Sequence, residues 1–263
     1  MHSGLQLLAD SYARISLYGY VMEKNLFEGG VALVWVRSRS NMRKQRPRGS
    51  TTREAVVNAA LNVADRSGLD ALTIRGVAEE VAAPPMSLYV HFANKNQLLD
   101  LMYVEVSRRM YADEGMPTWQ AELLRLCHRV REILTEHPNW APLLSRPAPP
   151  LALPLRERVL GLMIDDGMSE QQALKALWGI SLAAVGMVMA ELTMRAPDGK
   201  PAVEARFERM RELIQDMPGD EHAQTRAAMQ RLEHFSLGDT FSFTMGALIN
   251  GVASANHKRV DDA

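Results

Sequence analysis

The side chains that could carry out covalent chemistry are few and are poorly spaced for it. The close polar pairs are Cys127–His128, Glu136–His137 and Asp165–Asp166. Because neighbouring residues on a helix point about 100° apart, a pair such as Cys127–His128 is badly placed to act as nucleophile and base. The chain has no glycine-rich phosphate loop, Gly-x-Ser-x-Gly or His-Glu-x-x-His motif, and it has one cysteine. The sequence therefore predicts no catalytic residue, no metal site and no cofactor.

Basic side chains are the second chemically capable group, and they are concentrated in one part of the chain. From Arg37 to Lys95 the sequence has 10 basic and 5 acidic residues, a net charge of +5, whereas the remainder has 20 and 26, a net charge of −6. Clustered lysine and arginine neutralise phosphates, so this asymmetry is typical of a nucleic-acid-binding module joined to a non-binding domain. A solvated charged face is the alternative interpretation.

Capping signals predict four helices in and just after this basic part. A capping box at Thr51 and Glu54 starts the first, and Gly68 ends it. Thr73 caps the second, and Pro84–Pro85 separates it from the third. The last three predicted helices span residues 74–81, 85–92 and about 94–110. A short turn between the second and third is typical of a helix-turn-helix unit.

Helical patterns continue from Pro117 to the C-terminal region. A capping box at Ser169 and Gln172 precedes a long apolar helix to Met194, and Asp239 is expected to cap a final helix to about His257. The apolar faces of these two helices exceed what one monomer's core requires, which favours a helix-bundle homodimer. A central position in a monomeric core is the alternative.

The expected architecture is all-α, with an N-terminal three-helix DNA-binding domain and a C-terminal helical ligand-binding and dimerisation domain. The predicted limits are 49–110 and 111–257, with a poorly ordered extension and basic arm at 1–48 and a tail at 258–263. Met42 is a candidate true start, a hypothesis that native peptides from residues 1–41 would contradict. No apolar run approaches a membrane span and no secretion signal is evident, so we expect a cytoplasmic protein without a membrane partner.

Two segments carry a family resemblance. The Thr-x-Arg-x-x-Ala pattern of Leu72–Val81 lies at a fixed distance before Leu-Tyr-x-His-aromatic and Asn-Lys, within Met86–Lys95. Together they resemble the DNA-binding domain of TetR-type bacterial repressors over residues 51 to about 110. From residue 117 to 257 the likeness is looser, and the last helix is similar to that of the branch containing the tetracycline repressor.

The resemblance implies a homodimer that binds an inverted-repeat operator in double-stranded DNA. An arginine on the second helix would read base edges, the start of the third helix would face the major groove, and residues after it would contact phosphates. The implied DNA-binding residues are Thr73, Arg75, Pro85, Met86, Ser87, Tyr89, His91 and Lys95.

Two positions depart from the family pattern. Ala82 stands where the family often has a turn glycine, and Pro84 replaces a polar cap, which puts one phosphate contact in doubt. The basic arm Arg43–Arg48 would compensate if it followed a narrow minor groove; a solvated linker is the alternative.

The resemblance also implies a small hydrophobic effector that releases the protein from DNA. Large side chains that adapt to irregular ligands are the candidates for its pocket, although each also suits a core position. They are Trp119, Trp140, Met163, Trp178 and Met187. Tetracycline is not predicted, because no spacing picks out a metal site for its magnesium complex. The alternative function is a helical ligand-binding module whose helix-turn-helix no longer binds DNA.

Overall fold

The computed structural model describes residues 16–17, 20–27, 30–37, 51–112, 115–194, 202–215, 222–231 and 236–261. Its backbone divides into two compact units, residues 1–50 and 51–263. Each unit is described separately below.

The first unit contains an antiparallel sheet where we expected a poorly ordered extension. Its strands are β1 (Ser16–Leu17), β2 (Tyr20–Phe27) and β3 (Gly30–Arg37), in the order β1-β2-β3. The β2–β3 register pairs Tyr20 with Arg37 and Phe27 with Gly30. Both strands are rich in β-branched and aromatic residues, but the apolar run in β3 is continuous and so lacks the alternation that marks a strand in sequence. The predicted basic arm, Arg43–Arg48, lies outside the described residues.

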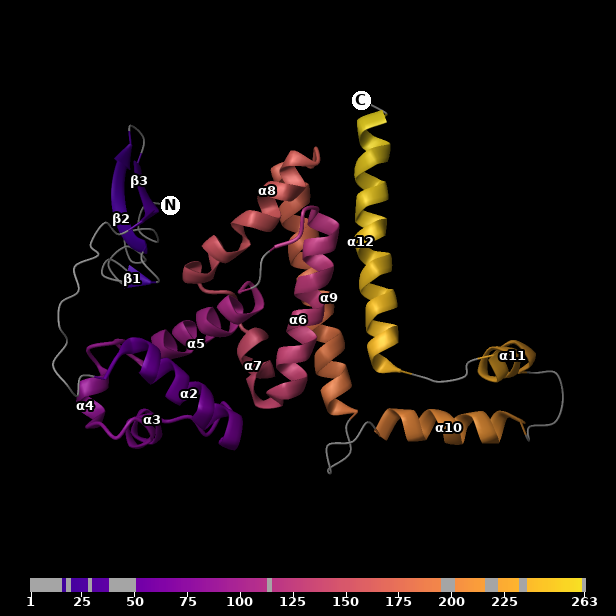
Figure 1. Ribbon diagram of the computed structural model, residues 1–263, viewed down its shortest axis with the longest axis horizontal. Helices are drawn as coiled ribbons and strands as arrows, with labels where there is room; N and C mark the ends of the chain where they lie inside the picture. Colours follow the sequence, from indigo (N-terminus) through magenta and orange to yellow (C-terminus); the bar gives the residue numbers. More distant parts are fainter. Residues whose placement is uncertain are drawn as a thin grey trace. The chain divides into compact units, whose positions relative to one another are not determined.

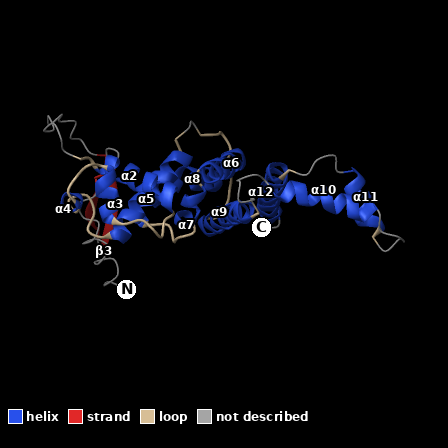
Figure 2. Cartoon of the chain, turned by 90° about the horizontal axis from the view of Figure 1, so that it is seen from below, coloured by secondary structure: helices blue, strands red, loops and turns tan. Residues whose placement is uncertain are grey.

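The regular elements among the described residues of the second unit are all helices, joined by loops and turns (Figure 2). Its first four helices are α2 (Arg53–Ser67), α3 (Ile74–Glu80), α4 (Pro85–Leu88) and α5 (Lys95–Met110). Thr52, one residue later than the predicted Thr51, caps α2 by accepting a hydrogen bond from the Ala55 N–H at 3.1 Å. At the other end of α2, Gly68 has φ +82° and its N–H donates to the Ala64 carbonyl.

The remaining described helices build the larger part of this unit. They are α6 (Trp119–Glu136), η1 (Pro138–Trp140), α7 (Ala141–Leu144), η2 (Pro150–Arg156), α8 (Glu157–Asp165), α9 (Glu170–Thr193), α10 (Ala202–Gln215), α11 (Ala223–Arg231) and α12 (Leu237–Asp261). Helices α6, α9 and α12 pack side by side (Figure 1). Their shared core includes Leu123, Leu177 and Phe241, all almost fully buried.

The two long C-terminal helices begin and end close to the predicted positions. The capping box of Ser169 and Gln172 is present at the start of α9. Helix α12 starts earlier than expected, because the Ser236 hydroxyl rather than Asp239 acts as the cap and accepts from the Asp239 N–H at 3.2 Å. It also continues to Asp261, so the tail predicted at 258–263 is helical as far as that residue.

Helix α9 corrects the expectation that no segment could span a membrane. By length and composition alone it is long and apolar enough to do so, and most of that stretch is not buried. In the structure α9 packs against α6, α8 and α12, as a core helix does. Glycine and serine interrupt the apolar run of α9, so its membrane-like character lies in its length and mean hydropathy and not in an unbroken apolar stretch.

Candidate nucleic-acid interface

Helix α3 presents an arginine on a capped and fixed turn. The Thr73 hydroxyl accepts a hydrogen bond from the Gly76 N–H at 3.1 Å, which fixes the start of the helix. Two residues after the cap, Arg75 points into solvent with 84% of its side chain exposed. Its Nε donates to Glu79 Oε1 at 3.0 Å, within an exposed pair that is worth little. The guanidinium can therefore exchange this carboxylate for another acceptor at small cost.

The turn between α3 and α4 contains an unusual backbone conformation. Ala82 has φ +50°, the left-handed region, and it is the one non-glycine residue with positive φ among the described residues. Around it the Ala82 N–H donates to the Glu79 carbonyl at 3.2 Å and the Ala83 N–H to the Ala78 carbonyl at 2.9 Å. These bonds hold the turn tight, and the left-handed φ at Ala82 is one that glycine adopts without steric cost.

Helix α4 starts on proline and lacks a side-chain cap. Pro84 makes no capping hydrogen bond, as its missing hydroxyl predicts, and Pro85 occupies the first turn. The Ser87 hydroxyl donates to the Pro84 carbonyl at 2.6 Å. The helix ends at Leu88, four residues earlier than the predicted Phe92, because residues 89–91 form a turn in which the His91 N–H donates to the Leu88 carbonyl at 2.9 Å.

Apolar side chains form the exposed face of this short segment. Met86 is 77% exposed and Val90 is 76% exposed, whereas Leu88 and Phe92 are buried beneath them. Val90 was not among the residues predicted to bind DNA. Its position four residues after Met86, on the side opposite the two inward residues, was the signal that could have found it. Such a face can contact apolar groups such as thymine methyls.

Tyr89 and His91 lie at the end of the same segment in different surroundings. Tyr89 is 45% exposed, and its ring is tilted against Phe92 with centroids 5.9 Å apart. His91 is half-buried beside the start of α2, where burial and then the nearby Arg53 charge lower the pKa of its imidazole. Because the ordinary value is about 6.5, His91 is mainly neutral at pH 7 and can offer a ring N–H but little positive charge.

Lys95 completes the set as the first residue of α5. The helix is capped by Asn94, whose side chain accepts from the Gln97 N–H at 3.0 Å, while Gln97 Oε1 accepts from the Ala93 N–H at 2.5 Å. Lys95 itself is exposed. The described structure thus brings Arg75, Met86, Tyr89 and Lys95 to the solvent-exposed surface of α3, α4 and the start of α5, with His91 less accessible.

The five predicted effector-binding residues do not converge on one cavity. Trp119, Trp140 and Met163 are buried in the core. The Trp119 indole N–H donates to Asp166 Oδ2 at 2.7 Å, and the Trp140 indole N–H donates to the Leu61 carbonyl at 3.1 Å. On α9, Trp178 is 57% exposed and Met187 is half-buried.

A cavity of about 70 Å³ lies elsewhere, between α5, α6 and α9, and none of the five lines it. Its walls are mainly apolar, but Arg156 Nη2 donates to the Tyr103 hydroxyl at 3.1 Å within it. Burial raises the pKa of the Tyr111 phenol to about 12, so that hydroxyl stays protonated. The lining also includes Cys127, whose thiol pKa burial raises to about 12.

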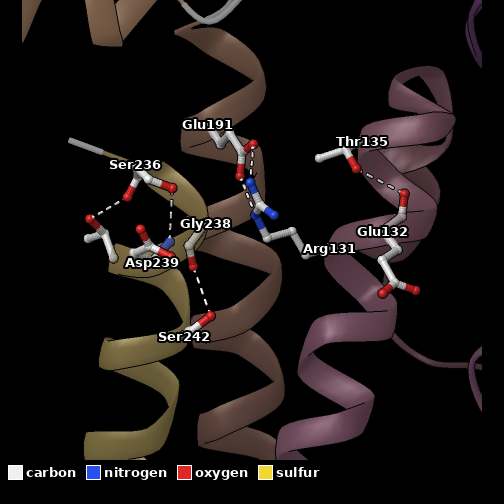
Figure 3. Close-up of polar contacts among 9 residues, drawn as sticks. Arg131, Glu132, Thr135, Glu191, Ser236, Gly238, Asp239 and Ser242 are labelled. Atoms are coloured by element: carbon white, nitrogen blue, oxygen red, sulfur yellow. Dashed lines mark hydrogen bonds and ion pairs between the residues drawn. The ribbon is translucent and has the colours of Figure 1, made fainter. Parts of the chain in front are cut away.

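Two of the helices around this cavity, α6 and α9, are held together by a partly buried ion pair (Figure 3). Arg131 on α6 donates from Nε and Nη2 to both carboxylate oxygens of Glu191 on α9, at 2.8 and 2.9 Å. The same guanidinium lies over the Phe241 ring of α12, 5.9 Å from its centroid. Arg131 of α6 therefore contacts both of the other long helices, α9 and α12.

The described residues contain no group of three or more histidine, cysteine or acidic side chains that could hold a metal ion. Cys127 is buried with its thiol protonated, so it is not an activated nucleophile.

Two family profiles match the chain. The first, described as bacterial regulatory proteins of the tetR family, matches residues 56–102. The second, described as a tetracyclin repressor-like C-terminal domain, matches residues 112–255, more than half of the chain.

Individual relatives agree with these profiles. An HTH-type transcriptional regulator of Saccharopolyspora erythraea is 30% identical over 198 residues, which cover 73% of this chain and 81% of the relative. The tetracycline repressor protein of class D from Escherichia coli is 30% identical over 186 residues, covering 65% and 82%. The crystal structure of apo ActR from Streptomyces coelicolor has the same fold, with a TM-score of 0.65 at 21% identity over 81% of this chain and all of ActR.

The family assignment rests on the helix-turn-helix geometry, on both family profiles and on these relatives. The chain belongs to the TetR family of bacterial transcriptional regulators, with a DNA-binding helix-turn-helix domain followed by a C-terminal ligand-binding domain.

Proposed function

We propose that the protein is a homodimeric repressor that binds an inverted-repeat operator and is released from it by a small hydrophobic effector. The observation that carries this proposal is the exposed face of α3 and α4, where a long cation, two apolar side chains and a phenol are presented to solvent with no core role. A monomer gains nothing from exposing Met86 and Val90 so fully, whereas a major groove can bury both.

The roles within this face follow from chemistry and exposure. Arg75 would leave Glu79 and form a bidentate pair with a guanine. Met86 and Val90 would contact thymine methyls, Tyr89 and Lys95 would bind phosphates, and His91 would add an uncharged N–H. Thr73, Pro85 and Ser87 would have an indirect role, because they hold the protein backbone in the N-terminal turns of α3 and α4 in place.

Dimerisation would use the exposed apolar stripe of α9 and α12. On α9, Trp178 and Leu182 are 57% and 71% exposed, and on α12 Phe243 is 79% exposed. Each such side chain contributes about 1.5–3 kcal/mol when fully buried. A second copy of this chain would cover the stripe, which also accounts for the membrane-like composition of α9 without a membrane.

The effector would enter the cavity between α5, α6 and α9. A volume of about 70 Å³ is too small for a drug-sized ligand, which occupies roughly 300 Å³ or more, so binding must move the surrounding helices. Apolar walls with the Arg156–Tyr103 pair and the Tyr111 hydroxyl suit a mainly hydrophobic molecule with one or two oxygen acceptors. Since α5 directly follows the DNA-contacting segment, its displacement would change the spacing of the two recognition helices.

The test is in-vitro selection from random duplex DNA with the purified protein at two salt concentrations. Enrichment of an inverted repeat supports a dimeric sequence reader and supplies the operator for effector screening by release. Binding that is salt-sensitive but unpatterned, or no binding at all, would contradict the repressor.

One observation favours the second candidate, a ligand-binding module that does not bind DNA. Pro84 leaves the start of α4 without the side-chain cap that would also serve a phosphate. If selection fails while small hydrophobic molecules still bind, this candidate replaces the first.

A further inference from the structure

A second cavity, of about 300 Å³, lies where α5 meets α6 and η1. It shares no lining residue with the cavity between α5, α6 and α9. Its chemistry is also different, because most of its lining is charged or aromatic. The charged and aromatic lining residues are Arg108, Arg109, Arg129, Glu136, His137 and Trp140.

One wall of this cavity is rigid. The rings of His137 and Trp140 are stacked with centroids 3.8 Å apart, and the Trp140 indole N–H donates to the Leu61 carbonyl of α2 at 3.1 Å. His137 Nδ1 lies 2.9 Å from Asp65 Oδ2, also on α2. A site built on side chains fixed in this way loses little conformational entropy when it binds a ligand.

Three guanidinium groups from two helices face this wall. Arg108 and Arg109 on α5 both donate to the buried carboxylate of Glu105, and the Arg109 guanidinium lies 5.2 Å from the Trp140 ring centroid. These contacts fix the position of both cations. Glu136, whose side chain is 75% exposed, is the one carboxylate among the lining residues.

Arg129, the third cation, carries a donor that the described structure leaves unused. Its Nη1 donates to Glu132 at 3.0 Å, in a pair that is largely exposed. Its Nε is buried and has no hydrogen-bond partner within the described residues. A buried donor without a partner is costly, so an acceptor is expected at this position.

We propose that this cavity binds a small oxyanion, the carboxylate or phosphate group of a metabolite. The planar guanidinium fork matches the two oxygens of such a group, and Arg129 Nε would supply one of the donors. The ligand would connect α5 to α6 and would sit beside the contacts of His137 and Trp140 with α2. It is therefore an additional ligand site, placed where the end of α5 meets α6 and η1 and next to α2.

Isothermal titration calorimetry of the full chain with sodium phosphate and, separately, sodium benzoate tests the site. Sodium chloride holds the ionic strength constant in both titrations. At least one of the two anions is expected to bind saturably with one site per protomer. Phosphate binding alone would identify a phosphate-bearing ligand, and benzoate binding alone a carboxylate.

Matched variants locate the binding. Arg129→Gln removes the cation and costs only an exposed ion pair, so the protein should fold normally and the Kd should rise about ten- to hundred-fold. The control is Arg209→Gln on α10, which removes the same charge from an exposed position and should leave the Kd unchanged. In nitrogen-15 spectra the Nε–H signal of Arg129, identified by its loss in Arg129→Gln, should move during the titration.

Three outcomes would overturn the proposal. They are no saturable binding of either anion, the same Kd in wild type and Arg129→Gln, or an equal loss of affinity in Arg209→Gln. The site does not depend on DNA binding, so a failed operator selection would leave this test unaffected.

Discussion

Replacing Ala82 by glycine should stabilise the protein. The φ of +50° places an L-residue in the left-handed region, which costs about 1–2 kcal/mol, and glycine avoids this cost. Glycine also has more freedom in the unfolded chain, which offsets about 0.4–1 kcal/mol of the gain. Ala82 is exposed, so little packing is lost, and its N–H bond to the Glu79 carbonyl is kept. The net expectation for Ala82→Gly is a gain of about 0.5–1 kcal/mol in the free energy of unfolding.

Ala83→Gly is the matched control, because Ala83 is the next residue and has no positive φ. It should destabilise the protein by about 0.5–1 kcal/mol, so the two variants should differ by roughly 1–2 kcal/mol. Urea unfolding followed by circular dichroism, at one protomer concentration, measures both midpoints. If the two glycines lowered the midpoint equally, the strain assigned to the turn at Ala82 would be refuted.

Four further outcomes are expected. Arg75→Ala should weaken operator binding by about 1–3 kcal/mol at one base position, whereas Lys95→Ala should weaken binding to all sequences and reduce the salt slope by about 1; equal losses on operator and random DNA for the arginine variant would contradict base reading. Ala184→Leu should fill the cavity of about 70 Å³, at a stability cost of about 1–3 kcal/mol, and give a repressor that binds DNA but ignores effector; release at the unchanged effector concentration would place that ligand elsewhere. Leu182→Glu should convert the proposed dimer to a monomer in light scattering, and a dimer mass that stays unchanged would show that α9 is not the interface. The lowered pKa of His91 means that the unfolded chain binds more protons just below pH 6.5, so stability should fall as the pH is lowered from about 7 to 5.5; in His91→Gln this dependence should be weaker, and an identical pH profile would exclude the residue as its source.

Local signals in the sequence were sufficient to predict most helices. The cap at Thr73, the capping box of Ser169 and Gln172, and Gly68 act within three or four residues of the chain, and each is found where the pattern placed it. The helix-turn-helix family was identified for the same reason, because its motifs lie close together in sequence. Local patterns failed at the first cap, at the end of α4 and in β3, where a neighbouring hydroxyl, a tight turn or strand pairing decided the outcome.

The sites between helices could not be predicted in this way. Trp119 and Met163 have the size and softness of pocket residues, but tertiary packing places both in the core, and the buried Trp140 lines the second cavity instead of the one between α5, α6 and α9. Arg108 and Arg129 come from different helices, and only the crossing of α5 and α6 brings them to one cavity. Residue type and local periodicity therefore determined the helices and the exposed residues of α3 and α4, whereas the cavities depend on how helices far apart in sequence pack together, and only the tertiary structure decides that.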